Sequence, residues 1–450
     1  MIKIMRFFKT GEDKPPLQDS EQIDRLYKRN RLSIMLTITL GYGIYYVGRL
    51  GLSVVKKPLI DAGIFSAEQL GVIGSAIFYT YAFGRLTNGF LADHSNVKRF
   101  LPFGLLISAL INMTMGFSPL YWAWIVLWGM NGWFQGFGSV SSVVAMSHWF
   151  SNKERGRYYG IWSTAHSIGE GLTFVGTATL VTILGWQAGF IGAGLFCAFV
   201  AVGMFFALND RPPTLGLPTI ADWKDDHGVE LAEKANDKFS ISKVQAQIFK
   251  LPAIWVLGLA SATMYMTRYA INSWGILYLQ EAKGYSLIEA GGILGLNTVA
   301  GLAGCTAYGF ISDKLFKAKR PPVTLIFGLM EVLSLIVIFY LPPGHPAFLT
   351  AAFVFYGFSL SGILAALGGL FAVDIAPKRA TGAAMGFIGV FSYLGAAVQE
   401  RISGSLIQSG TTMVDGVRYY DFSTAILFWV GASILSLILA SSLWRVKVAD

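Results

Sequence analysis

Long apolar segments alternate with short polar ones along almost the whole chain. A helix needs roughly 20 mostly apolar residues to cross a bilayer core of about 30 Å. The short segments of alternating polarity typical of a transmembrane barrel are absent from the sequence. Twelve segments are long and apolar enough, and we expect an all-α membrane protein with spanning helices near residues 32–54, 66–92, 99–117, 121–149, 156–184, 187–207, 252–280, 285–312, 321–341, 346–374, 381–408 and 421–444.

The polar segments divide these helices into two groups of six. Residues 208–250 form the one long polar segment between spans, with proline and charges of both signs. We therefore expect one six-helix bundle over residues 32–207 and a second over 251–444, joined by a linker at 208–250. Residues 1–31 and 445–450 are the expected terminal segments.

The basic residues predict which loops face the cytoplasm. The chain has 35 Lys and Arg against 26 Asp and Glu. With the N-terminus in the cytoplasm, 27 basic residues fall on the cytoplasmic side, and the opposite side has four: Lys56, Lys57, Lys283 and Arg418. Because cytoplasmic loops are enriched in Lys and Arg, we expect both termini in the cytoplasm. The net charge of +9 then reflects membrane topology and does not indicate nucleic-acid binding.

The composition excludes several other classes. Apolar residues make up 54% of the chain and charged residues 14%, against about 25% charged residues in soluble domains, so neither a soluble enzyme nor a disordered chain fits. Cys197 and Cys305 lie in apolar runs and cannot form a disulfide framework or a thiolate metal cluster. The sequence has no nucleotide-binding GxxxxGK[ST] motif. We expect no enzymatic activity, no cofactor and no metal.

The two halves contain an internal repeat. GFLADHSNVKRF and GFISDKLFKAKR place Asp93 and Asp313 at the expected cytoplasmic ends of two corresponding helices, each followed by bases. Arg49 and Arg268 are separated by almost the same interval as the two aspartates, and they lie at similar depths in the first and seventh spans. Parallel repeats of six helices form two bundles around a central cavity.

Arg49 and Arg268 carry the strongest functional indication. A charged side chain at the centre of a membrane helix costs about 2.5–3.5 kcal/mol on insertion scales, and neither helix has an acid near its arginine. Two guanidinium groups can hold a dianionic phosphate through bidentate hydrogen bonds. We interpret the pair as a phosphate clamp. The alternatives are that Glu or Asp neutralises the arginines, or that their side chains extend to the membrane surface.

The motifs of this chain resemble the major facilitator superfamily, and more closely its organophosphate:phosphate antiporter branch. The resemblance covers nearly the whole chain and is carried by LGYGIYYVGR (40–49), YAFGRLTNGFLADHSN (81–96), NGWFQGFGS (131–139), HWFSNKERG (148–156), WSTAHSIG (162–169), NDRPPTLGLP (209–218), YMTRYAINSWG (265–275), SDKLF (312–316) and GFIGVFSYLG (386–395). It implies a monomer in the bacterial inner membrane that exchanges a sugar phosphate, with glucose-6-phosphate expected, for inorganic phosphate by alternating access.

Helical spacing places further candidates beside the arginines. Seven and three residues before Arg49, and three before and four after Arg268, are Tyr42, Tyr46, Tyr265 and Asn272. The resemblance adds Tyr81 and Arg85 as residues that line the pore. Packing is the alternative for each tyrosine, and extension to the membrane surface is the alternative for Arg85.

His166 and Glu170 lie one turn apart on the fifth span. A lone buried histidine is more often a core residue, but the resemblance implies that His166 faces the substrate. Glu170 stands where relatives have glycine, and we expect it to balance charge or carry a proton. Two further departures are Leu50, where relatives have Lys, and Thr298, where they have an acid.

Asp93 and Asp313 are interpreted as gating residues, with simple topology signals as the alternative. Two other functions remain open for the same fold. One is a sensor that detects hexose phosphate, which some relatives of this kind are. The other is a proton-coupled symporter of an organic anion, in which Glu170 and His166 relay the proton.

Overall fold

The computed structural model describes residues 7–226, 249–317, 319–375 and 381–445. Within this part of the chain the long elements are helices, together with one antiparallel hairpin formed by β1 (Thr411–Val414) and β2 (Val417–Tyr420). Residues 227–248 of the predicted linker, and 1–6 and 446–450 of the predicted terminal segments, lie outside the described residues.

Six membrane-length helical segments precede the linker. They are α2 (Ser20–Asp61), α3 (Ala67–Asp93), α4 (Val97–Phe117), α5 (Tyr121–Trp149), a segment made of α6 (Asn152–Ser163), α7 (Ala165–Leu172), η1 (Thr173–Thr177) and α8 (Ala178–Leu184), and α9 (Trp186–Ala207). The short η2 (Pro212–Leu215) and α10 (Ile220–Lys224) follow.

Six more segments follow the linker. They are α13 (Pro252–Lys283), α14 (Leu287–Phe310) continued by η3 (Ile311–Leu315), α15 (Arg320–Tyr340), α16 (Pro346–Ala365) continued by η4 (Ala366–Leu370) and α17 (Phe371–Ile375), α18 (Thr381–Ser409), and α19 (Ser423–Ser442) continued by η6 (Leu443–Arg445). Each of the twelve predicted spans coincides with one of these segments, so the all-α prediction is confirmed.

Seven of the twelve are long and apolar enough to cross a membrane by length and composition alone. The other five are α2, α3, α5, α13 and α18. These helices pack on one another, α3 against α5 and α18, and α13 against α2 and α18. Several charged residues on them, including Arg49, Arg268 and Glu400, are therefore buried away from lipid, which is how membrane helices accommodate charged side chains.

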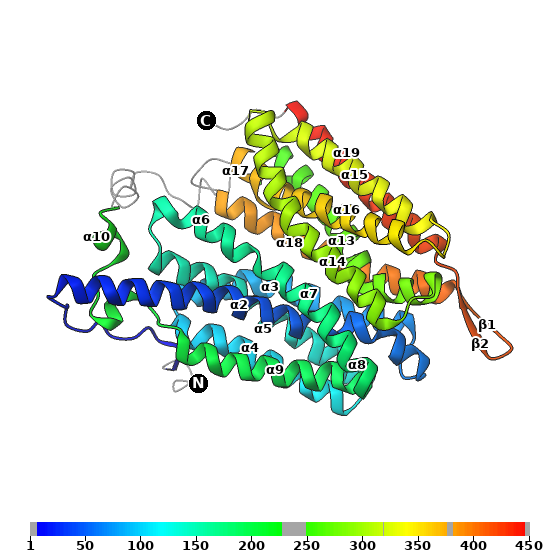
Figure 1. Cartoon of the computed structure of the whole chain (residues 1–450), viewed down its shortest axis with the longest axis horizontal. Helices are drawn as coiled ribbons and strands as arrows, with labels where there is room; N and C mark the ends of the chain where they lie inside the picture. The colour runs from blue at the N-terminus through cyan, green and yellow to red at the C-terminus, as the bar shows by residue number, and fades with distance from the viewer. Residues whose placement is uncertain (1–6, 227–248, 318, 376–380, 446–450) are drawn as a thin grey trace.

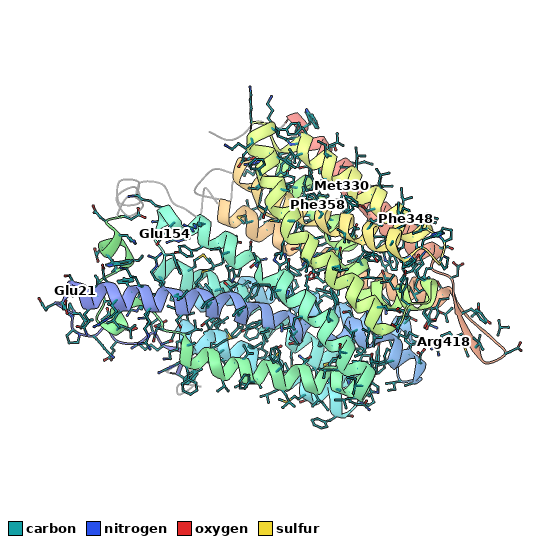
Figure 2. The ribbon with its side chains drawn as sticks, in the orientation of Figure 1. Glu21, Glu154, Met330, Phe348, Phe358 and Arg418 are labelled. Atoms are coloured by element: carbon teal, nitrogen blue, oxygen red, sulfur yellow. The ribbon has the colours of Figure 1, made fainter. Side chains whose placement is uncertain are left out.

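Many large apolar side chains lie exposed on the outer surface. Phe348, labelled in Figure 2, is 69% exposed, and Phe199 and Phe206 are 77% and 76% exposed. Exposed apolar area on this scale would be unfavourable in water, whereas hydrocarbon is a suitable solvent for it.

Helix α2 is longer than the sequence pattern predicts, at both ends. It begins at Ser20 because the Asp19 side chain caps it by accepting a hydrogen bond from the backbone N–H of Glu21. It continues to Asp61, so Lys56 and Lys57 are helical residues beyond the predicted end of the span at residue 54. The hydrophobic pattern could not reveal this, because Lys56 is polar and yet completely buried.

The repeat seen in the sequence extends to the helix starts. The Ser66 side chain accepts from the Gln69 backbone, and Ser286, its counterpart in the second half, accepts from Glu289 in the same way. In both cases the second side chain accepts from the serine backbone N–H, which completes a capping box. These boxes begin α3 and α14 at equivalent places in the two halves.

Figure 1 shows the two halves as inclined layers, α2, α4, α5 and α9 in one and α13 to α19 in the other. The β1–β2 hairpin lies at one end of the molecule, which we call the hairpin end. Both marked chain ends lie toward the opposite side, which we call the terminal end. The labelled Arg418 and Glu154 lie at the hairpin end and the terminal end, respectively (Figure 2).

Contacts at the hairpin end join the two halves closely. Helices α3 and α18 cross at Gly71 and Gly404, where a Cβ added to Gly404 would come within 2.6 Å of the Ala67 carbonyl oxygen and 2.8 Å of the Gly71 Cα. Lys56 pairs with Glu400 in the same region. The described structure is therefore closed at the hairpin end.

The first prediction concerns this crossing. Gly404→Leu should force α3 and α18 apart, since overpacking of a close contact costs about 1–3 kcal/mol, which corresponds to a population shift of about fivefold to 150-fold. An Ala67→Cys reporter, 3% exposed in the parent, should then react with a polar maleimide at least about fivefold faster. The matched control is Gly431→Leu, because a Cβ there meets no atom within 4 Å. Equal labelling rates in the two variants would contradict the prediction.

Candidate functional site

Arg49 is buried in α2 with most of its hydrogen-bonding capacity unused. Its side chain is 3% exposed, and Nε donates a hydrogen bond to Gln135 Oε1 at 3.3 Å. Nη1 and Nη2 have no hydrogen-bond partner among the described residues. The guanidinium carbon lies 4.7 Å from the ring centre of Tyr46 and 4.3 Å from that of Tyr81. The aromatic faces stabilise the cation, but no anion among the described residues pairs with it.

A buried polar network positions Gln135, the side chain that accepts the hydrogen bond from Arg49 Nε. Gln135 Nε2 donates to Ser108 Oγ at 2.7 Å, and Ser108 donates to Asn131 Oδ1 at 2.5 Å. Asn131 and Asn112 each donate to the Gly48 carbonyl, at 2.8 and 2.9 Å. These bonds direct the Gln135 oxygen toward α2. Gln135 lies within the motif NGWFQGFGS, but its residue type alone gave no reason to assign it this contact.

Arg268 is equally buried, in α13 of the other half, but it is paired. It is 5% exposed, and its Nη2 donates to the carboxylate of Glu170 on α7. For Arg268 the structure therefore shows the alternative in which an acid neutralises the arginine. The predicted seventh span has no acid near Arg268, and Glu170 lies 98 residues away in sequence.

A small polar cavity adjoins the Arg268–Glu170 pair. Its volume is about 20 Å³, which is room for about one water molecule. The cavity brings together four predicted site residues, His166, Glu170, Arg268 and Asn272. Asn272 Oδ1 and Asn297 Oδ1 have no hydrogen-bond partner in the part of the chain that the structure describes. These amides are available to a ligand.

Tyrosine rings connect the surroundings of the two arginines. Tyr393 of α18 lies 4.4 Å from Tyr81 and 5.3 Å from Tyr265, measured between ring centres. Tyr265 and Tyr269 flank Arg268, with ring centres 5.7 and 5.6 Å from its guanidinium carbon. The site is therefore lined from both halves.

Two of these tyrosines, Tyr269 and Tyr393, were not predicted from the sequence. Tyr269 directly follows Arg268 and so does not share its helical face. Tyr393 lies in the motif GFIGVFSYLG, far from either arginine in the chain, and only the packing of α18 against α3 and α13 brings it to the site. Tyr46 and Tyr269 each lie within electrostatic range of both guanidinium groups.

Two predicted residues lie at the edge of this group. Tyr42 stacks on Trp162, with ring centres 5.0 Å apart and planes 22° apart, and its ring meets that of Tyr46 edge to face at 5.6 Å. Arg85 is exposed, and a Cβ added to Gly389 of α18 would lie 3.4 Å from its Nη1. Neither side chain contacts the guanidinium group of Arg49 or Arg268.

Asp93 and Asp313 both lie exposed at the terminal end, away from the arginines. Asp313 forms an ion pair with Arg320 at 2.7 Å, and Arg320 also reaches Asp374 at 3.2 Å. This network lies wholly within the second half. Among the described residues, the ion pairs that join the two halves are instead at the hairpin end or at Arg268.

These features define the class of protein. Twelve spanning helices in two related halves, with a buried cationic site between them, form a multi-pass membrane protein of the transporter class. The model of the Major Facilitator Superfamily matches residues 38–399, and the chain belongs to this superfamily. It is a transporter-family protein, not an enzyme.

Curated relatives lie within the predicted branch. The chain is 33% identical to the membrane sensor protein UhpC of Salmonella typhimurium, over 88% of this chain and 89% of that one. It is 31% identical to a probable hexose phosphate transport protein of Chlamydia trachomatis, over 95% and 94%. It is 32% identical to the glycerol-3-phosphate transporter of Haemophilus influenzae, over 84% and 86%. The predicted resemblance to the organophosphate:phosphate antiporter family is confirmed.

Solved structures share the fold. A bacterial homolog of the human lysosomal transporter Spinster, in an inward-facing and unoccupied conformation, superposes with a TM-score of 0.73 at 16% identity, over 94% of this chain and 99% of that one. At this level of identity the likeness concerns the fold alone.

Proposed function

We propose that this chain is a secondary active transporter that exchanges a sugar phosphate, with glucose-6-phosphate the expected substrate, for inorganic phosphate by alternating access. The observation that carries the proposal is Arg49, a buried guanidinium whose Nη1 and Nη2 have no partner among the described residues. A buried, unpaired charge is strongly unfavourable, and a phosphate oxygen is the acceptor that best fits the guanidinium fork.

The rest of the site suits the remainder of such a substrate. Arg268 supplies a second guanidinium from the other half, and the unpartnered Asn272 and Asn297 amides suit sugar hydroxyls. The names of the relatives support a phosphate ester, since they include a hexose phosphate transport protein and a glycerol-3-phosphate transporter.

The orientation of the protein in the membrane follows from the charge pattern. Because 27 basic residues lie on the side of the termini and linker, we place the terminal end in the cytoplasm of a bacterial cell and the hairpin end outside the inner membrane. The closed hairpin end then corresponds to an inward-facing state. In this proposal a monomer works by rocking residues 32–207 against residues 251–444, with Asp93 and Asp313 in the inner gate.

The test is exchange in proteoliposomes loaded with inorganic phosphate. Labelled glucose-6-phosphate added outside should accumulate in phosphate-loaded vesicles, and the same assay with labelled glycerol-3-phosphate or inorganic phosphate should rank the substrates. Vesicles loaded with sulfate and vesicles without protein are the controls. Absence of uptake with all three compounds would refute the transport proposal.

A sensor function is the second candidate, favoured by the 33% identity to a membrane sensor protein. A sensor would bind glucose-6-phosphate at the same arginines without sustaining flux. Calorimetric binding to purified protein, combined with the exchange assay, separates the two functions. Binding with no exchange would assign the sensor function.

A further inference from the structure

The two buried arginines of the site differ in what they contact. The side chains of Arg268 and Glu170 are each 6% exposed and form an ion pair. Arg49, the counterpart of Arg268 in the first half, has Nη1 and Nη2 without partners among the described residues. One half of the site is therefore already supplied with an anion by the protein, and the other half is not.

Glu170 occupies the place on Arg268 that a phosphate group would use. Carboxylates and phosphates accept hydrogen bonds from the same guanidinium N–H groups. The adjoining cavity, about 20 Å³ in volume, holds about one water molecule. A phosphate group is larger than this space, so it can bind at this part of Arg268 only if the Glu170 carboxylate moves away.

The chain around Glu170 is suited to such a movement. Gly169 and Gly171 flank it, and the π-helical turn η1 begins at Thr173. π-Helical turns inside α-helices occur frequently at functional sites. Gly169 itself packs closely on the backbone of Gly43, which fixes α7 on α2 while leaving the Glu170 side chain directed at the other half.

We propose that Glu170 is a tethered counter-anion, which neutralises Arg268 while the site is empty and is displaced by the phosphate group of the substrate. The inference rests on the function proposed above and assigns a role to a residue within that site. The ion pair joins α7 of the first half to α13 of the second, so it also links the halves when no substrate does.

This role of Glu170 alters the transport cycle expected for a site with two unpaired arginines. A carrier with two unpaired buried cations resists closing around an empty site, which enforces strict exchange. Glu170 removes that penalty at Arg268. The wild-type protein should therefore catalyse net efflux of substrate without a counter-substrate, alongside exchange.

The binding test compares Glu170→Gln with the wild type. Removal of the competing charge should tighten binding of inorganic phosphate to the purified protein about tenfold, as measured by calorimetry. Glu68→Gln is the matched control, because Glu68 also faces a cation of the other half, Arg401 at 3.7 Å, but is exposed. The control should bind phosphate as the wild type does.

The transport test measures net efflux and exchange on the same vesicles. Glu170→Gln should lower the ratio of net efflux to phosphate exchange at least about tenfold, because the empty carrier now has an unpaired Arg268. If Glu170→Gln fails to fold, Glu170→Asp serves instead. Its shorter carboxylate pairs more weakly with Arg268, so it should shift affinity and ratio in the same directions by a smaller amount.

The results distinguish this inference from the function on which it rests. Weaker or unchanged phosphate binding by Glu170→Gln, or an unchanged ratio of net efflux to exchange, would overturn the counter-anion role. Exchange by the wild type would still support the transporter function. A wild type that neither binds nor exchanges phosphate or glucose-6-phosphate would overturn both.

Discussion

Arg49→Lys is expected to reduce phosphate exchange at least about 30-fold, because truncating a buried charged partner of a ligand costs about 2–5 kcal/mol. Lysine would keep the charge but lose the planar fork that binds a phosphate in bidentate fashion. It would also lose the hydrogen bond from Nε to Gln135 and the stacking between Tyr46 and Tyr81. Exchange of labelled phosphate in proteoliposomes measures the effect.

The control for this variant is Arg401→Lys. Arg401 lies in α18, is about half exposed, and its ion pair among the described residues is the long one with Glu68, so the exchange rate of Arg401→Lys should match the wild type. Equal reconstitution of both variants shows that insertion is intact. If Arg49→Lys exchanges phosphate at the wild-type rate, the guanidinium does not bind the phosphate.

Glu400→Gln is expected to lower the melting temperature more than any other single charge removal at the hairpin end. Glu400 accepts hydrogen bonds from Lys56, from Ser273 at 2.8 Å and from Trp274 Nε1 at 3.0 Å. Lys56 is completely buried, with Nζ 3.4 Å from the ring centre of Trp274. Without Glu400 an ammonium remains in the interior, and breaking a buried pair in this way costs about 3–5 kcal/mol.

A double-mutant cycle separates this loss from simple loss of packing. Lys56→Met combined with Glu400→Gln removes both charges, so the double variant should recover most of the stability that Glu400→Gln loses. Thermal unfolding of the purified proteins in detergent measures both single variants and the double variant. If the double variant is as unstable as the sum of the single variants, the buried charge is not the cause.

The Lys56–Glu400 and Arg268–Glu170 pairs both join one half to the other, but their surroundings differ. Glu400 is held by three donors in a closed interface. Among the described residues, Arg268 is the hydrogen-bond partner of Glu170, beside a cavity with unpartnered amides. The first pair therefore persists while the hairpin end is closed, and the second adjoins a cavity where, under the counter-anion proposal, a ligand competes for Arg268.

Much of this protein's fold could be predicted from its sequence, because the bilayer constrains the length and hydropathy of each spanning segment, and both can be seen along the chain. Each spanning helix must satisfy its backbone hydrogen bonds internally and present about 20 mostly apolar residues, so the pattern of long apolar segments outlined twelve helices, seven of which meet the length and composition criterion in the structure. The same rule made Arg49 and Arg268 conspicuous, since a charge within an apolar span needs a reason. Their matching positions in a repeat made the pair, and not either residue alone, the functional indication.

Only the tertiary structure decided how the charges are paired. Helical spacing relates residues a few positions apart, whereas Glu170 reaches Arg268 across 98 residues and Glu400 reaches Lys56 across 344. Tyr393 likewise joins the site through the packing of α18. Sequence established that the membrane contains buried cations in two related halves. The fold determined which of them the protein neutralises itself and which has no ion-pair partner among the described residues, because electrostatic pairing depends on distance in space and not along the chain.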